Sequence, residues 1–216
     1  MNNYKTNDKK ALFASIFASG LDDLNVMFLS FTLASIISHL GLSGVEGGWI
    51  ATITNLGMLL GGLTFGVLAD RYNKFTVLKI TILIFSVATG LIFFTENLTY
   101  LYIMRFIAGI GVGGEYGVAI SIMAGIVPSE KMGRVSSLNG IVGQIGSITS
   151  AILASIIAPV FGWKGLFLFG LLPILLVAWM HCAISSDEIT DRGVKETDLN
   201  TDKPKNIIDR IINKHI

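Results

Sequence analysis

Four charged residues lie inside long apolar stretches of this 216-residue chain: Asp22, Asp23, Arg105 and Glu115. A charged side chain at the centre of a bilayer costs at least about 2.5–3.5 kcal/mol, so each of these residues needs a partner or a function. On one helix, Arg105 and Glu115 would be separated by about 15 Å, which is too far for them to pair with each other. We therefore expect their partners on other helices, and the stretch that contains Asp22 and Asp23 is the obvious source of carboxylates.

Three acids and one base leave an excess of negative charge. One interpretation is a structural ion pair between Arg105 and either Asp22 or Asp23, which would fix the register of two helices. In either case at least one carboxyl group stays without a counter-charge in apolar surroundings, where burial favours its neutral form. Such a group can carry a proton near neutral pH, which favours a functional interpretation. Asn25 shares roughly the helical face of Asp22, whereas Asp23 points about 100° away.

The composition places these charges in a membrane. Hydrophobic residues make up 52% of the chain and charged residues only 14%, whereas an ordinary soluble domain has about 25% charged residues. Apolar stretches long enough to cross about 30 Å of hydrocarbon recur along the chain. They cover residues 11–37, 49–69, 75–94, 98–127, 136–160 and 166–184, with breaks at 41–48, 70–74, 95–97, 128–133 and 161–164. The sequence therefore predicts an all-α integral membrane protein with six transmembrane helices.

Lysine and arginine set the predicted orientation, because cytoplasmic loops carry an excess of both. They lie in the two tails and after the second and fourth apolar stretches, and only Lys164 occupies an alternate loop. We expect a cytoplasmic tail at 1–10, a transmembrane bundle at 11–184 and a cytoplasmic linker at 185–216, in a multi-pass protein of the cell membrane. The last residues of the linker are a short amphipathic helix or a frayed tail.

Other classes of function find little support in the sequence. A net charge of +1 argues against a nucleic-acid partner, which would need a basic face. The single cysteine can form no internal disulfide. The sequence shows no nucleophile–base set and no metal-ligand cluster, so we expect no enzymatic activity, no metal and no cofactor.

Two strings carry a resemblance to a known family. The first is GGLTFGVLADRYNK at 61–74, a charged tight turn between two apolar stretches, and the second is RFIAGIGVGGEYG at 105–117. Together with Gly162, Trp163 and Lys164, they resemble the N-terminal half of a major facilitator superfamily transporter. The resemblance extends from residue 11 to about residue 186 and is strongest to the metabolite–proton symporter branch, which includes sialic acid and aromatic acid carriers.

The resemblance implies one half of a twelve-helix fold, built as two inverted three-helix repeats. A C-terminal six-helix half, in the same protein or in a second chain, would then complete a substrate cavity near the midplane of the lipid bilayer. The residues implied to line this cavity or to couple protons are Asp22, Asp23, Asn25, Arg105, Glu115, Tyr116 and Gln144, with Asn55 and Asn139 as further polar candidates. The residues implied to form a cytoplasmic gate loop are Gly66, Asp70, Arg71, Asn73, Lys74 and Arg134.

The implied function is secondary active transport, as proton-coupled symport of a small organic acid or acidic sugar by alternating access. Two alternatives stay open: a facilitator or exporter in which the carboxylates are structural, and a truncated half that does not transport. The chain also departs from the family pattern. Asn25 replaces the second acid of the first helix, and Asp23 stands where the family has glycine. Asn73 replaces a loop glycine, which is tolerable because asparagine adopts the left-handed conformation more readily than most residues.

Glycines form a second pattern. Gly109, Gly113 and Gly117 recur every four residues in one apolar stretch, and Gly62 and Gly66 do so in another. Small residues at this interval allow two helix backbones to approach closely in lipid. We expect helix packing at these positions.

Overall fold

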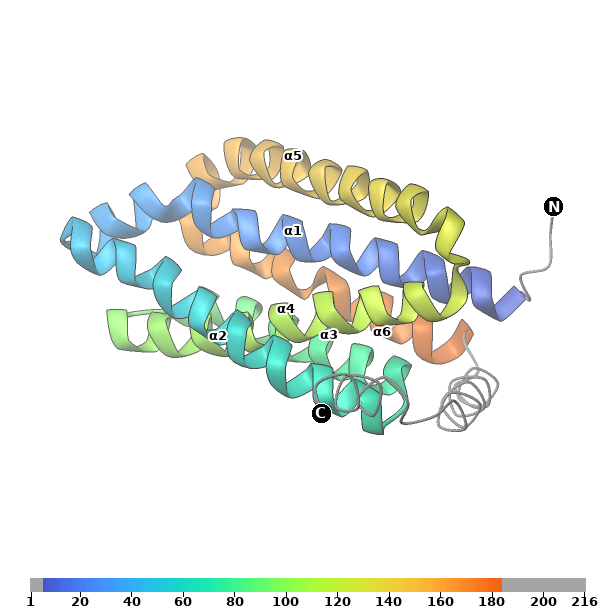
Figure 1. Cartoon of the computed structure of the whole chain (residues 1–216). Helices are drawn as coiled ribbons and strands as arrows, with labels where there is room; N and C mark the ends of the chain where they lie inside the picture. Colours follow the sequence, from blue (N-terminus) through green and yellow to red (C-terminus); the bar gives the residue numbers. More distant parts are fainter. Residues whose placement is uncertain (1–5, 184–216) are drawn as a thin grey trace, which may run out of the picture.

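The computed structural model of the chain describes residues 6–183, which form a bundle of long helices (Figure 1). Successive helices run in opposite directions along the bundle. The elements are α1 (Thr6–Leu40), α2 (Gly44–Arg71), α3 (Lys74–Leu91), the 3-10 helix η1 (Ile92–Phe94), α4 (Leu98–Ile126), α5 (Ser129–Leu168), the 3-10 helix η2 (Phe169–Leu171) and α6 (Leu172–Ala183). The predicted linker at 185–216, with its possible helix, lies outside the described residues.

Five helical stretches of the described chain are long and apolar enough to cross a membrane, and the last of them runs from Ser129 to Ala183. This 55-residue stretch contains the fifth and sixth predicted helices. Gly162 interrupts it with φ 69° and ψ 176°, a conformation that glycine adopts without steric cost. The chain turns back there, and α6 runs antiparallel to α5 (Figure 1). The break predicted at 161–164 therefore separates two crossings, as expected.

The helices extend further than the hydropathy pattern predicts. The Ser43 side chain accepts a hydrogen bond from the Glu46 amide, and the Glu46 carboxylate accepts one from the Ser43 amide at 2.8 Å. This capping box starts α2 at Gly44, so the break predicted at 41–48 is too long. The break predicted at 128–133 is also too long, because α5 starts at Ser129, directly after Pro128.

Asn73 has a different role from the one expected. Its φ of −58° lies outside the left-handed region, so the predicted conformation is wrong. Its Oδ1 instead accepts hydrogen bonds from the amides of Phe75 at 2.9 Å and Thr76 at 3.3 Å. Asparagine at this position therefore caps α3 by satisfying amides that have no partner inside the helix.

Glycines bring two pairs of helices into close contact. A Cβ atom at Gly109 or Gly113 of α4 would overlap the backbone of α2, and a Cβ atom at Gly61 of α2 would overlap the backbone of α4. In the same way, a Cβ atom at Gly146 of α5 would overlap the carbonyl group of Gly20 in α1. If α1, α2 and α3 are matched in chain order with α4, α5 and α6, the α1–α5 pair corresponds to the α4–α2 pair. The bundle is therefore built as two inverted three-helix repeats, as predicted.

The buried apolar side chains form two clusters, one toward each end of the bundle. The first contains residues of α1 up to Ala18, and the second begins on α1 at Leu24. Asp22 lies between these clusters and is itself buried. Asp22 and the buried Glu115 of α4 therefore form a polar layer near the middle of the bundle, whereas Asp8, a third buried acid, lies near the start of α1.

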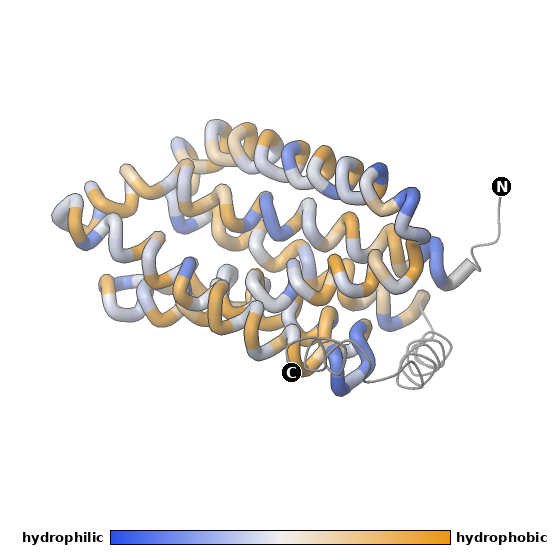
Figure 2. The backbone as a smooth tube through the Cα atoms, in the orientation of Figure 1, coloured by the Kyte–Doolittle hydropathy of each residue, from blue (hydrophilic) through white to orange (hydrophobic). Residues whose placement is uncertain are grey.

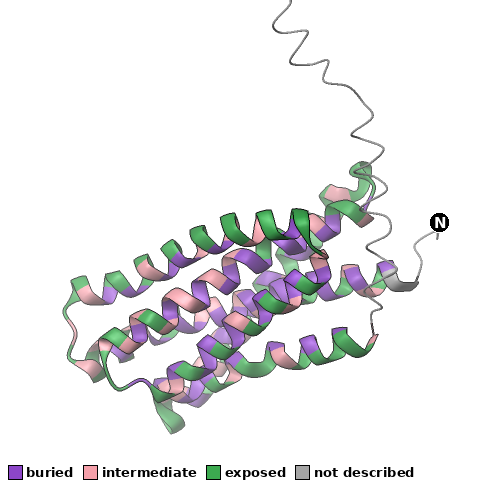
Figure 3. Ribbon diagram, turned by 90° about the horizontal axis from the view of Figure 1, so that it is seen from below, coloured by how far each residue is buried: buried purple, intermediate pink, exposed green. Residues whose placement is uncertain are grey.

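Large apolar side chains are exposed along the bundle, and hydrophobic residues recur along its helices in Figure 2. Exposed residues follow the outward faces of the helices in Figure 3. They include Leu59 and Leu63 of α2 and Ile148 and Ile156 of α5, each between 60% and 63% exposed. A continuous apolar exterior of this kind is typical of helices that contact lipid or other membrane helices.

Candidate functional site

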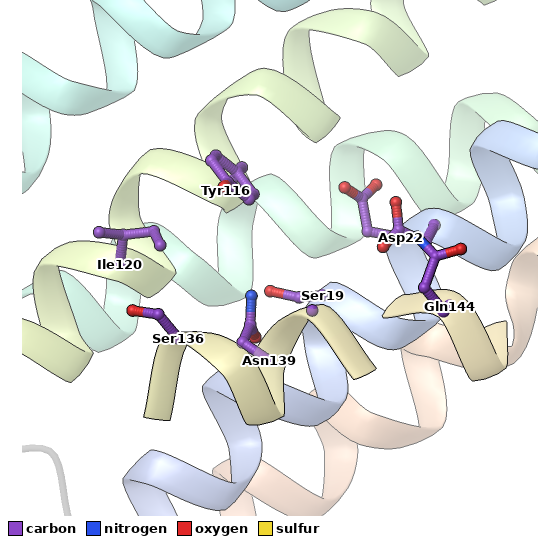
Figure 4. Close-up of a pocket in the computed structure, with 9 residues that line it drawn as sticks. Ser19, Asp22, Tyr116, Ile120, Ser136, Asn139 and Gln144 are labelled. Atoms are coloured by element: carbon purple, nitrogen blue, oxygen red, sulfur yellow. The ribbon is translucent and has the colours of Figure 1, made fainter. Parts of the chain in front are cut away.

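A cavity of about 380 Å³ opens between α1, α4 and α5 at the level of the polar layer (Figure 4). Polar side chains from all three helices line it. Its lining consists of Ser19, Asp22 and Asp23 from α1, Tyr116 and Ile120 from α4, and Ser136, Asn139, Gly140 and Gln144 from α5. Two carboxyl groups line this cavity, and its lining includes no lysine, arginine or histidine.

The helical spacing explains how α1 and α5 supply so many of these residues. Ser19 and Asp23 are separated by one turn of α1, and Asn139 and Gly143 are separated by one turn of α5, so each pair lies on one face. The close α1–α5 contact brings the two faces together. Gly143 lies directly against the Asp23 carboxylate, and a Cβ atom at this position would overlap its Oδ2.

Behind the cavity, Asp22 of α1 and Glu115 of α4 bring their carboxyl groups within hydrogen-bonding reach of each other. Asp22 is 6% exposed and Glu115 is fully buried. Asp22 Oδ1 and both Glu115 oxygens accept no hydrogen bond from any N–H or O–H group of the described residues. Ionised carboxylates only accept hydrogen bonds, so these two groups can bond to each other only when one of them holds a proton.

Arg105 does not neutralise these acids. Its guanidinium carbon lies 4.9 Å from the ring centroid of Phe167, in a cation–π arrangement. Its Nε and one terminal nitrogen are buried and have no hydrogen-bond partner within residues 6–183. The predicted pairing of Arg105 with Asp22 or Asp23 is therefore wrong. Arg105 packs instead against Phe167, which belongs to the apolar cluster that begins on α1 at Leu24. The excess of negative charge in the middle of the bundle is larger than the sequence alone indicates.

Asn25 also lies apart from the cavity. Its side-chain nitrogen donates to the carbonyl oxygen of Leu21 at 2.8 Å. Its Oδ1 faces η2, where a Cβ atom at Gly170 would come within 2.8 Å of it. Seven residues were predicted to line the cavity or couple protons. Four of them line it: Asp22, Asp23, Tyr116 and Gln144. Glu115 does not line the cavity but adjoins Asp22, and Asn25 and Arg105 lie elsewhere. Of the two further polar candidates, Asn139 lines the cavity and Asn55 is exposed on α2.

The predicted gate-loop residues gather at the end of the bundle where α2 meets α3 and α4 meets α5. Asp70, Arg71 and Arg134 are exposed, and no salt bridge joins them within the part of the chain that the structure describes. A Cβ atom at Gly66 would meet open space. Lys74 is half-buried at the start of α3, directly after the Asn73 cap.

Four lining residues were not predicted from the sequence: Ser19, Ile120, Ser136 and Gly140. Ser19 could have been found, because it lies one turn before Asp23 on the same helical face. Ser136 and Gly140 flank Asn139 on α5, and no feature of the isolated sequence distinguishes them from other small residues.

Comparison with known proteins identifies the family. Residues 13–210 match the family model of the Major Facilitator Superfamily. The niacin transporter NiaP of Acinetobacter baylyi is 36% identical over 72% of this chain and 36% of its own length. The sialic acid transporter NanX of Escherichia coli is 33% identical over 80% of this chain and 43% of its own length.

A solved structure shares the fold. The proton:xylose symporter XylE, bound to 6-bromo-6-deoxy-D-glucose, has a TM-score of 0.75 at 18% identity, covering 85% of this chain and 46% of the other. The chain spans less than half the length of the curated relatives it matches. The sequence match, the six-crossing bundle and its inverted repeats agree, and the chain belongs to the Major Facilitator Superfamily as a multi-pass membrane protein with the fold of an N-terminal half.

Proposed function

We propose that this chain is the N-terminal half of a proton-coupled carrier that transports a small organic acid or acidic sugar by alternating access. The observation that carries the proposal is the buried carboxyl pair of Asp22 and Glu115, which adjoins a polar cavity and has no basic partner among residues 6–183. A proton shared by the pair would remove the charge repulsion between the two carboxylates and create a hydrogen bond between them.

The energy available for coupling is substantial. Two unit charges at about 4 Å repel each other by roughly 4 kcal/mol at an effective dielectric constant near 20. Binding or release of the shared proton therefore changes the interaction between α1 and α4 by an amount comparable to the difference between two conformations of a carrier. Because α1 and α4 occupy equivalent places in the two inverted repeats, the proton acts where one repeat meets the other.

The substrate class is proposed from the relatives. Niacin and sialic acid, named for two of them, both carry a carboxylate group. An anionic substrate in this cavity would meet Asp22 and Asp23, and their repulsion would fall when protons neutralise the carboxylates. This charge balance favours symport of the anion with protons.

The partner of this chain is proposed to be a second six-helix half, since the relatives are more than twice as long as the part that this chain matches. It would complete the lining of the cavity. We further propose that both ends of the chain face the cytoplasm, that the gate-loop residues latch that side in one conformation, and that the protein resides in the cell membrane.

The experiment is uptake of sialic acid and niacin by proteoliposomes that contain this chain joined to the C-terminal half. We expect an inward proton gradient to drive accumulation. Asp22→Asn and Glu115→Gln should abolish accumulation while leaving exchange of labelled for unlabelled substrate measurable. The matched control is Glu96→Gln, which removes one exposed carboxylate far from the cavity.

Two results would count against the proposal. Wild-type uptake that does not depend on the proton gradient would favour a facilitator with structural carboxylates. Full gradient-driven accumulation by the Asp22→Asn variant would remove the proton role of the carboxyl pair.

A further inference from the structure

The cavity contains a second carboxyl group, that of Asp23, which has no role in the Asp22–Glu115 pair. Asp23 is half-buried, lines the cavity, and points to a different side of α1 from Asp22. Gly143 of α5 makes room for its carboxylate, since any side chain at this position would displace Oδ2. Asp23 has no basic partner in the described part of the chain, and a charged group held in this way in an apolar bundle calls for a ligand.

Two neutral side-chain oxygens belong to residues that line the same cavity as this carboxylate. Asn139 is 7% exposed, lines the cavity, and its Oδ1 has no hydrogen-bond partner within residues 6–183. Ser19 is 5% exposed and donates its hydroxyl hydrogen to the Ser15 carbonyl at 3.3 Å, which leaves its oxygen free to accept. Figure 4 shows the Ser19 hydroxyl and the side-chain amide of Asn139 facing each other across the α1–α5 contact, with the amide nitrogen toward Ser19.

From these oxygens we infer that the cavity binds a small monovalent cation between α1 and α5, held by Asp23, Asn139 and Ser19, with Asp22 Oδ1 completing the site. Carboxylate, amide and hydroxyl oxygens are the ligands that hard cations prefer. A cation with one positive charge matches the charge of this site. Asp22 shares a proton with Glu115 under the proposed function, so Asp23 is the one ionised carboxylate left in the lining. The occupant is Na⁺ or the ammonium group of a substrate, which share this chemistry.

This inference rests on the proposed function and deepens it by adding a cation to the same cavity. Its charged ligand is Asp23, which is not part of the proton pair, and the two proposals share only Asp22. The test is binding to the purified 216-residue chain and needs no second half. We expect NaCl to raise the unfolding temperature of the chain in a saturating manner, while choline chloride at the same ionic strength does not. Broadening of the ²³Na resonance by the protein gives an independent readout.

Variants locate the site. Asp23→Asn should weaken the Na⁺ response at least tenfold, and Gly143→Ala should weaken it by displacing the Asp23 carboxylate without removing it. Gly133→Ala, where a Cβ atom would meet open space, and Glu96→Gln should leave the response unchanged. Glu115→Gln, which breaks the proton pair, should retain it, so failure of this inference and failure of the proposed function can be distinguished.

Methylammonium chloride separates the two sources of the cation. A saturating response to methylammonium that exceeds the response to Na⁺ would assign the site to a substrate ammonium group, and the reverse order would assign it to Na⁺. Equal behaviour of NaCl, methylammonium chloride and choline chloride with the wild-type chain would overturn the inference. So would a full Na⁺ response in both Asp23→Asn and Gly143→Ala.

Discussion

Two glycines on α4, one turn apart, give a direct test of how the helices pack. A Cβ atom at Gly113 would overlap the Met58 carbonyl oxygen and lie 2.6 Å from its carbonyl carbon and 2.7 Å from its Cα. At Gly117, nothing lies within 4 Å. Gly113→Ala must therefore push α2 and α4 apart by roughly 1 Å to restore ordinary contact distances, whereas Gly117→Ala needs no movement.

The expected effects differ in sign. Overpacking of this kind costs about 1–3 kcal/mol, and replacing an unconstrained helical glycine by alanine gains up to about 1 kcal/mol. For a chain of this length, 1 kcal/mol shifts the unfolding temperature by roughly 2–4 °C. We therefore expect Gly113→Ala to unfold about 2–12 °C below the wild type and Gly117→Ala at or slightly above it.

The assay is thermal unfolding in detergent, followed by tryptophan fluorescence at one fixed scan rate, because unfolding of such proteins can be irreversible. Both variants have the same composition and differ only in the position of one methyl group. If Gly113→Ala unfolded at the same temperature as Gly117→Ala, or above it, the close α2–α4 contact would be refuted.

Three further predictions concern single contacts. Tyr102→Phe removes the 2.9 Å hydrogen bond from its hydroxyl to the Glu46 carbonyl, and should lower the unfolding free energy by about 1 kcal/mol in thermal or denaturant unfolding; no change would mean that water replaces this bond. Gly162→Ala forces a side chain into the left-handed region and should cost about 1–2 kcal/mol in the same measurement, whereas a neutral effect would contradict the break between α5 and α6. Lys10→Met removes the 3.0 Å hydrogen bond from Nζ to the Ala183 carbonyl. It should speed amide hydrogen exchange in the last turn of α6 but not in α2. An equal change of the exchange rate in both helices would count against this link.

Much of the fold could be predicted from the sequence because hydropathy determines which segments enter a membrane. Helix ends were predicted less well, since they depend on local side-chain bonds. Ser43 and Glu46 start α2 inside a glycine-rich segment that resembles a loop, and Asn73 caps α3 where a left-handed turn was expected. Hydropathy does not register either effect.

The candidate site was predicted in part for a related reason. Depth in the membrane can be estimated from sequence, and Asp22 and Glu115 are indeed level with each other. Because Arg105 precedes Glu115 by ten residues on α4, it lies about 15 Å along the bundle from the level of Asp22 and beyond its reach. The contact between Arg105 and Phe167 joins residues of α4 and α5, and only the folded bundle reveals it.

The most direct test of the account is the infrared spectrum of the purified chain near neutral pH. If Asp22 and Glu115 share a proton, the wild type will show the carbonyl band of a protonated, hydrogen-bonded carboxylic acid. The band will persist in Glu96→Gln and vanish in the Asp22→Asn/Glu115→Gln double variant. A wild-type spectrum that contains only ionised carboxylate bands would contradict the shared proton, and with it the proposed coupling mechanism.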